Sequence, residues 1–317
     1  MNARIACLAG LAFAAGCSGS AASSATVTAA ATAAPASTLP PTTLYVADRC
    51  TGRVDAFFSL ANGNVNPAWT IEGSATQLVH PASVAANGDG IWVSNNSGGP
   101  GVLRFAADAS GNAAATVVSA KPGSAQAISV DANGRTIAPG MNGTIATFAA
   151  DGSAAGAISG SATTTTFPRA AVAAADGTIY VANSNASILV FDANASGNVA
   201  PHAIIAGPAT GLKSPSALAF DSDGDLIVTD ESGLAVSIFA PGASGNVAPL
   251  RRIAGPHTAL NVPQGVAVAP DGSIYVANAS GKDVLVFAPH ADGDVAPRRI
   301  IAGDRTGFIC PAGVALQ

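Results

Sequence analysis

The sequence predicts an all-β fold, a six-bladed β-propeller with four antiparallel strands in each blade. The first observation is a short apolar run that ends in phenylalanine and recurs at intervals of 43 or 48 residues. The phenylalanines are Phe57, Phe105, Phe148, Phe191, Phe239 and Phe287. The second is another strand-like run upstream of the phenylalanines, such as residues 179–183. The third is the glycine, asparagine and proline that separate the runs, as in turns between short strands.

The repeat length favours a closed ring of sheets over a β-sandwich. One four-stranded sheet cannot cover both of its faces, so successive sheets must pack against each other. A period in the forties with four strands is typical of propeller blades, whose ring protects nearly all sheet edges. A β-sandwich, the main alternative, requires no regular period. We expect the repeated phenylalanines and the aromatic residues Tyr45, Trp92, Tyr180 and Tyr275 to fill the spaces between blades.

The two ends of the repeat region predict how the ring closes. The chain enters the repeats on a second strand, residues 44–48, and leaves them on a first strand, residues 311–316. We therefore expect 3+1 closure, in which the C-terminal strand completes the N-terminal blade. The third unit is irregular because Pro139 stands in a strand that should be paired on both sides, so we expect a bulge or a shortened strand there.

The N-terminal segment has the composition of an export signal and a tether. Residues 1–16 combine Arg4, an apolar stretch and small residues, as in a signal peptide. The segment that ends at Cys17 resembles a bacterial lipobox, although Ala14 stands where leucine is usual, which leaves plain secretion or an uncleaved anchor as alternatives. We expect lipidation at Cys17, a flexible Ser/Ala/Thr/Pro tether over residues 17–43, and the propeller over residues 44–317.

Composition excludes some partners. The 317 residues are 49% hydrophobic and 10% charged, with a net charge of −5 and dispersed basic residues, which argues against nucleic acid. No apolar run beyond the N-terminus approaches the ~18 residues of a membrane-spanning helix. We expect a monomer that needs no cofactor, touches the membrane only through its N-terminal lipid, and binds an unknown protein, glycan or small molecule.

The repeats resemble those of NHL-repeat propellers and of the related bacterial Tyr-Val-Thr-Asn repeats. The motifs that carry the resemblance are Pro-x-Gly-Val-Ala-Val at 263–268, Asp-Gly-x-Ile-Tyr-Val-Ala-Asn at 271–278 and Val-x-Val-Phe at 284–287. The resemblance covers residues 44–317 and implies the fold. Such propellers include lyases, lactonases, scaffolds and sensor domains. We expect a binding or interaction module, with a lactonase- or lyase-type enzyme that uses the channel mouth as the alternative.

The candidate ligand-binding residues lie in loops that follow second strands or precede first strands, which meet on one face of the ring. Two sets share this face: Asp48, Asn95, Asn183, Asp230 and Asn278 end second strands, and Gln126, Arg169, Ser216 and Gln264 lie nearer the channel mouth. The strand-end residues can accept hydrogen bonds from backbone N–H groups of a turn, and their recurrence favours this role over a ligand-binding or catalytic ring.

Metal chemistry has little support in the sequence. A lactonase-like site is expected to use a first-strand glutamate, but the chain contains only Glu72 and Glu231, both outside first strands. The four histidines lie at positions of the repeat that cannot converge: His80, His202, His257 and His290. Residues 221–225 start like a calcium loop but lack its later glycine and glutamate, and they align with an ordinary hairpin turn. We expect no metal site.

The cysteines predict a disulfide that locks the ring. Cys7 leaves with the signal peptide and Cys17 carries the lipid, so Cys50 and Cys310 remain in an oxidising setting. Cys50 follows the second strand of the first blade, and Cys310 precedes the first strand of the same blade. Because adjacent antiparallel strands place these ends together, their Cα atoms should reach the ~4.4–6.8 Å of a disulfide.

Overall fold

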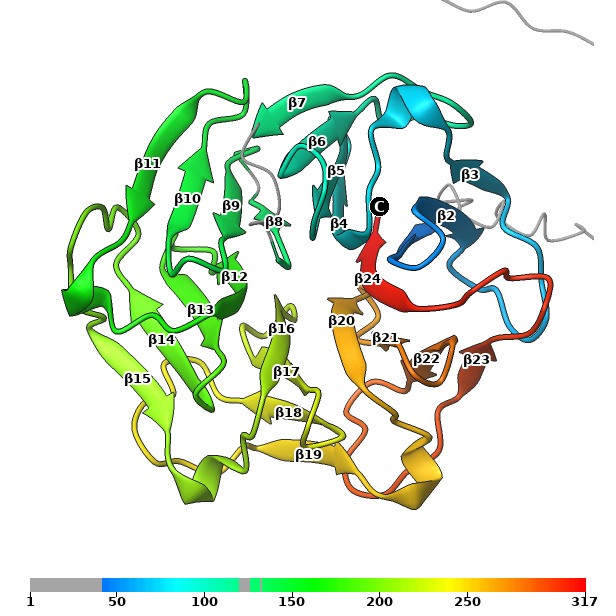
Figure 1. The fold of residues 1–317 in the computed structure, drawn as a ribbon. Coiled ribbons are helices and arrows are strands. Elements are labelled where there is room, and N and C mark those ends of the chain that lie inside the picture. The colour runs from blue at the N-terminus through cyan, green and yellow to red at the C-terminus, as the bar shows by residue number, and fades with distance from the viewer. Residues whose placement is uncertain (1–41, 120–125, 132) are drawn as a thin grey trace, which may run out of the picture. The chain divides into compact units, whose positions relative to one another are not determined.

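The computed structural model describes residues 42–119, 126–131 and 133–317, which include all of the predicted ring except residues 120–125 and 132. The signal peptide, Cys17 and nearly all of the tether lie outside the described residues. Six sheets of four antiparallel strands surround a central channel (Figure 1). The predicted six-bladed propeller is therefore confirmed.

Strand order runs outward from the channel in every blade. Blade 1 consists of β24 (Pro311–Leu316), β1 (Thr43–Asp48), β2 (Arg53–Phe58) and β3 (Trp69–Ile71). Blade 2 consists of β4 (Pro81–Asn87), β5 (Gly90–Asn95), β6 (Val102–Phe105) and β7 (Thr116–Ser119). Blade 3 consists of β8 (Ser129–Val130), β9 (Thr136–Pro139), β10 (Ile145–Phe148) and β11 (Ala154–Ile158).

The second half of the ring is more regular. Blade 4 consists of β12 (Pro168–Ala173), β13 (Ile179–Asn183), β14 (Ser187–Phe191) and β15 (Ala203–Ala206). Blade 5 consists of β16 (Pro215–Phe220), β17 (Leu226–Asp230), β18 (Ala235–Phe239) and β19 (Arg251–Ala254). Blade 6 consists of β20 (Pro263–Val268), β21 (Ile274–Asn278), β22 (Asp283–Phe287) and β23 (Arg299–Ile301).

The ring closes as the chain ends predict. Strand β24 pairs antiparallel with β1, with Leu316 opposite Leu44 and Val314 opposite Val46. In Figure 1 the red C-terminal strand accordingly lies beside the blue strands of the N-terminal blade. Blade 1 thus joins residues from the two ends of the repeat region, and the 3+1 closure is confirmed.

The core lies between blades, where the apolar faces of neighbouring sheets pack together. The phenylalanines that end the third strands fill this space: Phe57, Phe105, Phe191, Phe239 and Phe287 are at most 2% exposed. One cluster joins Phe287 and Val276 of blade 6 to Val236 and Ile253 of blade 5. Burial of these side chains on both faces of each sheet explains why the apolar repeat specifies a ring.

The innermost strands approach each other closely at the channel. A Cβ on Gly313 of β24 would lie 2.6 Å from the Cα of Ser83 in β4, and one on Gly265 of β20 would lie 2.7 Å from the carbonyl oxygen of Ala312. No side chain fits at those distances. Glycine in the Pro-x-Gly motif therefore allows three neighbouring strands to converge on the channel axis.

At their outer edges, successive blades are joined by a clip, a short 3-10 turn that bonds to a turn of the next blade. A short 3-10 turn follows several outermost strands: η1 (Ser74–Thr76), η2 (Ser161–Thr163), η3 (Pro208–Thr210) and η4 (Pro256–Thr258). An N–H group of this 3-10 turn donates a hydrogen bond to the side chain of the Gly-Asn or Gly-Asp turn in the next blade. Asn246 Oδ1, for example, accepts from the N–H of Ala209 at 2.8 Å. Among the described residues, this clip and its parallel bridge join every pair of neighbouring blades except 2 and 3. The 43-residue interval from Phe105 to Phe148 spans that junction.

Blade 3 is shortened at the Pro139 strand, as expected, and its innermost strand is shorter still. Strand β8 has two residues, whereas β9 has four and ends at Pro139. Pro139 lies opposite Ile145 of β10, and its carbonyl oxygen accepts a bond from the N–H of Gln126. Because proline has no N–H with which to form the reciprocal hydrogen bond, the ladder between the two inner strands stops short of the channel mouth.

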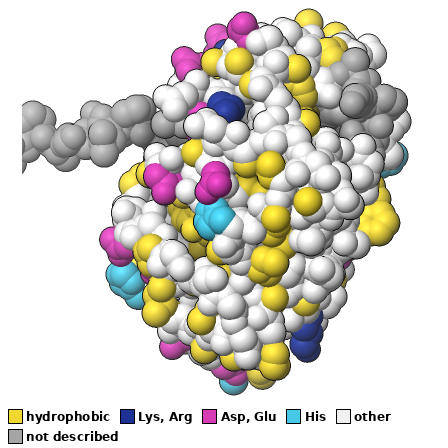
Figure 2. Space-filling view, turned by 90° about the vertical axis from the view of Figure 1, so that its left-hand side faces the viewer, with side chains coloured by type: hydrophobic (Ala, Val, Ile, Leu, Met, Phe, Trp, Pro, Cys, Tyr) yellow, Lys and Arg dark blue, Asp and Glu magenta, His cyan; other side chains and the backbone are white. Residues whose placement is uncertain are grey.

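The surface of the ring is mixed in character. On the flank formed by the left-hand side of Figure 1, apolar and charged side chains are interspersed (Figure 2). In the part of the chain that the structure describes, no helix has the length and apolar character needed to cross a membrane.

Candidate functional site at the channel mouth

A β-bulge aims the second residue of several innermost strands at the mouth. Pro168 of β12 lies opposite Asn183, but the next pair is Ala170 with Ala182, so Arg169 has no partner across the ladder. The same shift leaves Ser216 of β16 and Gln264 of β20 unpaired. Bulges of this kind redirect side chains and are common next to functional sites.

The two strand-end aspartates are fully buried and anchor the loops around the mouth. Asp48 accepts backbone N–H bonds from four residues, namely Cys50, Thr51, Ile309 and Cys310. Asp230 accepts them from Lys213, Ser214 and Gly233. Both side chains are 0% exposed. Each carboxylate thus ties the loop that enters an innermost strand to the end of the second strand.

The strand-end asparagines anchor the corresponding loops with one oxygen instead of two. The Oδ1 atom accepts an N–H bond from the residue two positions before the strand-entry proline: Asn95 from Val79, Asn183 from Thr166 and Asn278 from Asn261. In these three blades the residue directly before the proline adopts a positive φ: 49° at His80, 47° at Phe167 and 60° at Val262. An aspartate accepts a hydrogen bond from the N–H of this residue through its second carboxylate oxygen. Asparagine lacks that oxygen, and the residue before the proline adopts a left-handed conformation instead.

All five strand-end residues therefore use their polar atoms within the protein. Asn95, Asn183 and Asn278 are also 0% exposed, and their amide nitrogens donate to loop oxygens nearby. The arrangement is the structural role that their recurrence favoured. It holds the mouth loops in place rather than presenting these side chains to a ligand.

The second predicted set lies at the mouth itself. Arg169 forms an ion pair with Glu231, which reaches it from blade 5. Gln264 Oε1 accepts a 3.0 Å hydrogen bond from Arg49 Nη2 of blade 1. Gln126 is next to Arg169, since the N–H of Ala127 donates to the Arg169 carbonyl at 2.9 Å. These contacts bring side chains of five blades to one opening.

Ser216 is placed differently from its neighbours in this set. Its side chain is 5% exposed, and its hydroxyl donates to the carbonyl oxygen of Pro263 in blade 6 at 2.9 Å. A second contact joins it to the Thr229 hydroxyl at 3.0 Å. Ser216 thus links two blades beneath the mouth.

Arg49 and Glu231 belong to the site although the sequence analysis did not select them. Each directly follows a strand-end aspartate, Asp48 or Asp230, and this shared position was the signal available. Arg49 is half-buried. Burial and the nearby guanidinium of Arg169 lower the pKa of Arg49 from its usual value, while the Glu231 carboxylate acts in the opposite direction.

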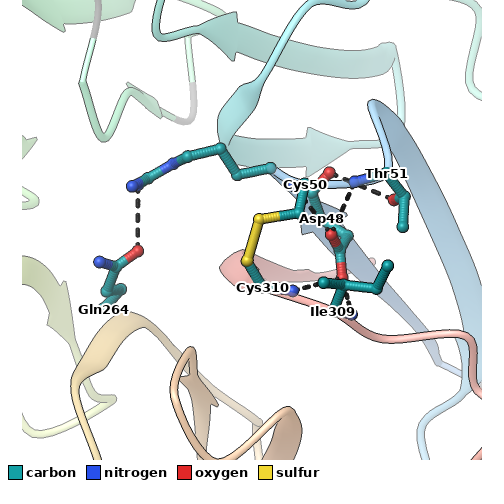
Figure 3. Close-up of a disulfide and its surroundings, with 7 residues drawn as sticks. Asp48, Cys50, Thr51, Gln264, Ile309 and Cys310 are labelled. Atoms are coloured by element: carbon teal, nitrogen blue, oxygen red, sulfur yellow. Dashed lines mark hydrogen bonds between the residues drawn. A yellow bond between two sulfur atoms is a disulfide. The ribbon is translucent and has the colours of Figure 1, made fainter.

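The disulfide lies on the same face, beside Arg49. Cys50 and Cys310 are bonded with their Cα atoms 5.4 Å apart, across 260 residues of sequence. Figure 3 shows Asp48 next to the bridge and Gln264 at the end of the hydrogen bond that crosses the mouth. The predicted disulfide is confirmed, and it fixes the loop from which Arg49 extends.

A cavity of about 240 Å³ lies in the central channel between the innermost strands. It is bordered by the innermost strands, mostly through alanine, valine, leucine and glycine residues. Within the described part of the chain, three buried side-chain atoms have no hydrogen-bond partner: Arg49 Nε, Gln126 Nε2 and Ser129 Oγ. Ser129 lines the cavity, and the other two atoms belong to mouth residues. Unpartnered buried polar atoms are rare and need an explanation.

Metal ligation has no cluster to support it in the described residues. Over 42–119, 126–131 and 133–317, no group of three or more His, Cys, Asp and Glu side chains is arranged to hold an ion. The acidic run at 221–225 forms a hairpin turn, in which Asp221 accepts bonds from the N–H groups of Asp223 and Asp225.

Comparisons with known proteins show the fold alone. No family model and no curated protein matches the sequence. A protein of unknown function from Bacteroides caccae is 14% identical, with a TM-score of 0.63 over 87% of this chain and 98% of that one. The WD40 β-propeller domain of Doa1 is 12% identical, with a TM-score of 0.58 over 83% and 79%. A functionally unknown protein from Desulfotomaculum acetoxidans is 12% identical, with a TM-score of 0.56 over 86% and 98%. This chain is therefore a β-propeller similar in fold to proteins of widely different sequence.

Proposed function

We propose that this protein is an exported, lipid-anchored NHL-like propeller that binds a ligand at the channel mouth. The observation that carries the proposal is the convergence of Arg49, Gln126, Arg169, Glu231 and Gln264 on one opening, with buried donor atoms that have no partner in the described residues. Polar groups that serve only the fold normally satisfy one another, as the strand-end aspartates do. Side chains with unused donors at a concave opening are typical of binding sites.

The rim of the mouth supports the same proposal. Large apolar side chains in its loops are exposed to solvent: Met141 by 46%, Phe167 by 58%, Leu234 by 44% and Ile309 by 50%. These four residues come from four different blades and surround a polar centre. Exposed apolar groups around convergent polar groups are typical of surfaces that contact a ligand. Rigid blades that present such loops offer a binding face without further rearrangement.

Removing the polar centre tests the proposed site. We expect a triple variant, Gln126→Ala, Arg169→Ala and Gln264→Ala, to lose affinity by about tenfold or more for ligands found in a panel of neutral, anionic and cationic metabolites. The melting temperature should fall by less than about 4 °C because the substituted side chains lie outside the core. Isothermal titration calorimetry on the full mature chain measures the affinities.

The matched control changes the opposite end of the ring. Asp223 and His290 are exposed there, and Asp223→Ala with His290→Ala should leave all affinities unchanged. Equal affinities of the triple variant and the wild-type protein would place the site elsewhere. A panel in which no compound binds would contradict the proposal of a small-molecule site.

The disulfide supports export, since such bonds persist in oxidising compartments. We expect Cys17 to be the mature N-terminus and to carry the lipid. Cells grown with a clickable fatty acid should label the wild-type protein, and Cys17→Ala should abolish the label while Cys50→Ala retains it. An unlabelled product that begins downstream of Cys17 would instead indicate plain secretion.

A further inference from the structure

The two mouth side-chain atoms without a hydrogen-bond partner among the described residues are both donors. Arg49 donates through Nη2 to Gln264, but its Nε has no acceptor among the described residues. Gln126 Nε2, the other unpartnered atom of the mouth, is also a donor. A group that bonds to either atom must therefore supply an acceptor, such as an oxygen. Water supplies these weakly, whereas an ionised oxygen forms bonds of roughly twice the strength to such donors.

The ion pairing at the mouth points in the same direction. Glu231 pairs with Arg169, and Arg49 has no ion-pair partner among the described residues. The nearby aspartates Asp48 and Asp230 are fully buried and already accept four and three backbone N–H bonds. A partly buried cation without a counter-ion is costly, and an incoming anion removes that cost.

No residue outside the described ranges can supply the second carboxylate. Residues 1–41, 120–125 and 132 contain no aspartate or glutamate, and residues 120–125 include a lysine. A side-chain counter-ion for Arg49 from those segments is therefore absent from the sequence itself. Arg49 therefore has no ion-pair partner among the described residues and no candidate carboxylate side chain in those segments, and a bound anion would supply one.

We propose that the mouth binds an oxyanion, a carboxylate or phosphate group of a small ligand, held by Arg49 Nε and Gln126 Nε2. This inference rests on the proposed function and adds the charge class of the ligand. The Arg169–Glu231 pair is the internal example of the same recognition, a carboxylate held by a guanidinium at this opening. The channel cavity of about 240 Å³ is smaller than the ~300–1,000 Å³ of sites for drug-sized molecules and is lined by inner-strand residues rather than by Arg49 or Gln126, so we expect only a small anionic group to bind at the mouth.

The test compares probes that differ in charge but little in size. The full mature chain is titrated with acetate, inorganic phosphate, neutral acetamide and methylammonium at constant ionic strength, so that general screening is equal in all arms. We expect acetate or phosphate to bind and to raise the melting temperature, and acetamide and methylammonium to do neither. Tighter binding of acetate would identify a carboxylate ligand, and tighter binding of phosphate would identify a phosphate ligand.

Two variants locate the anion. Arg49→Gln keeps a donor but removes the charge, and we expect it to weaken anion binding about tenfold or more. Arg251→Gln removes an arginine that lies near Asp221 and Asp225 at the opposite end of the ring, and it should leave binding unchanged. Equal losses in both variants, or none in Arg49→Gln, would overturn the anion site.

The outcomes separate this inference from the proposed function. If neutral or cationic metabolites bind at the mouth and the triple variant loses them, the binding function stands and the charge class is wrong. If anions bind and only Arg49→Gln weakens them, both stand. If neither the anions nor any metabolite binds, both fail.

Discussion

Replacing Cys50 and Cys310 together by serine is expected to lower the free energy of unfolding by about 2–5 kcal/mol. The bridge closes a segment of 260 residues, so the reduced chain gains much more freedom when unfolded. Without it, β24 is held to β1 by strand pairing, by apolar contacts such as Val314 opposite Val46, and by the N–H bonds of the preceding loop to Asp48. Urea unfolding followed by circular dichroism, with and without reductant, measures the difference.

The wild-type protein in reductant serves as the matched control for this variant. It should unfold at the same urea concentration as the double-serine protein, since both lack the covalent link. Reductant should have no effect on the double variant. An unreduced double variant that unfolds at the urea concentration of the oxidised wild-type protein would show that the bridge adds no stability.

Replacing Asp230 by alanine is expected to cost about 3 kcal/mol or more. The substitution leaves the N–H groups of Lys213, Ser214 and Gly233 without an acceptor, and hydrogen bonds to a charged group contribute about 1.5–3 kcal/mol each. Asp230→Asn should cost less, about 1–2 kcal/mol, because one oxygen remains and the loop can adopt the form found in the asparagine blades. Thermal and urea unfolding measure both variants.

An exposed aspartate of the same blade provides the comparison. Asp223 lies in a hairpin at the opposite end, and Asp223→Ala should change stability by no more than about 0.5 kcal/mol. A loss in Asp230→Ala as small as that in Asp223→Ala would contradict the anchoring role of the strand-end carboxylate.

The sequence by itself determined the architecture because a propeller repeats one local pattern. Phenylalanine recurs where a third strand ends, and Phe239 and Phe287 occupy equivalent places between blades. The Pro-x-Gly motif marks the entry to an innermost strand, and the positions of Cys50 and Cys310 in the repeat were enough to predict their bond. These features depend on neighbours in sequence or on the repeat register, both of which can be read from one chain.

The mouth depended on contacts that no local pattern encodes. Arg169 and Glu231 are 62 residues apart and meet because blades 4 and 5 pack together, whereas Arg49 and Gln264 are 215 residues apart and meet only because the ring closes. The bulge that frees Arg169 from the ladder is a shift between two strands rather than a property of one. The recurrence of the strand-end residues favoured a loop anchor over a ligand ring but left both roles open. Burial of all five decided which role their polar atoms serve, because burial follows from packing between blades.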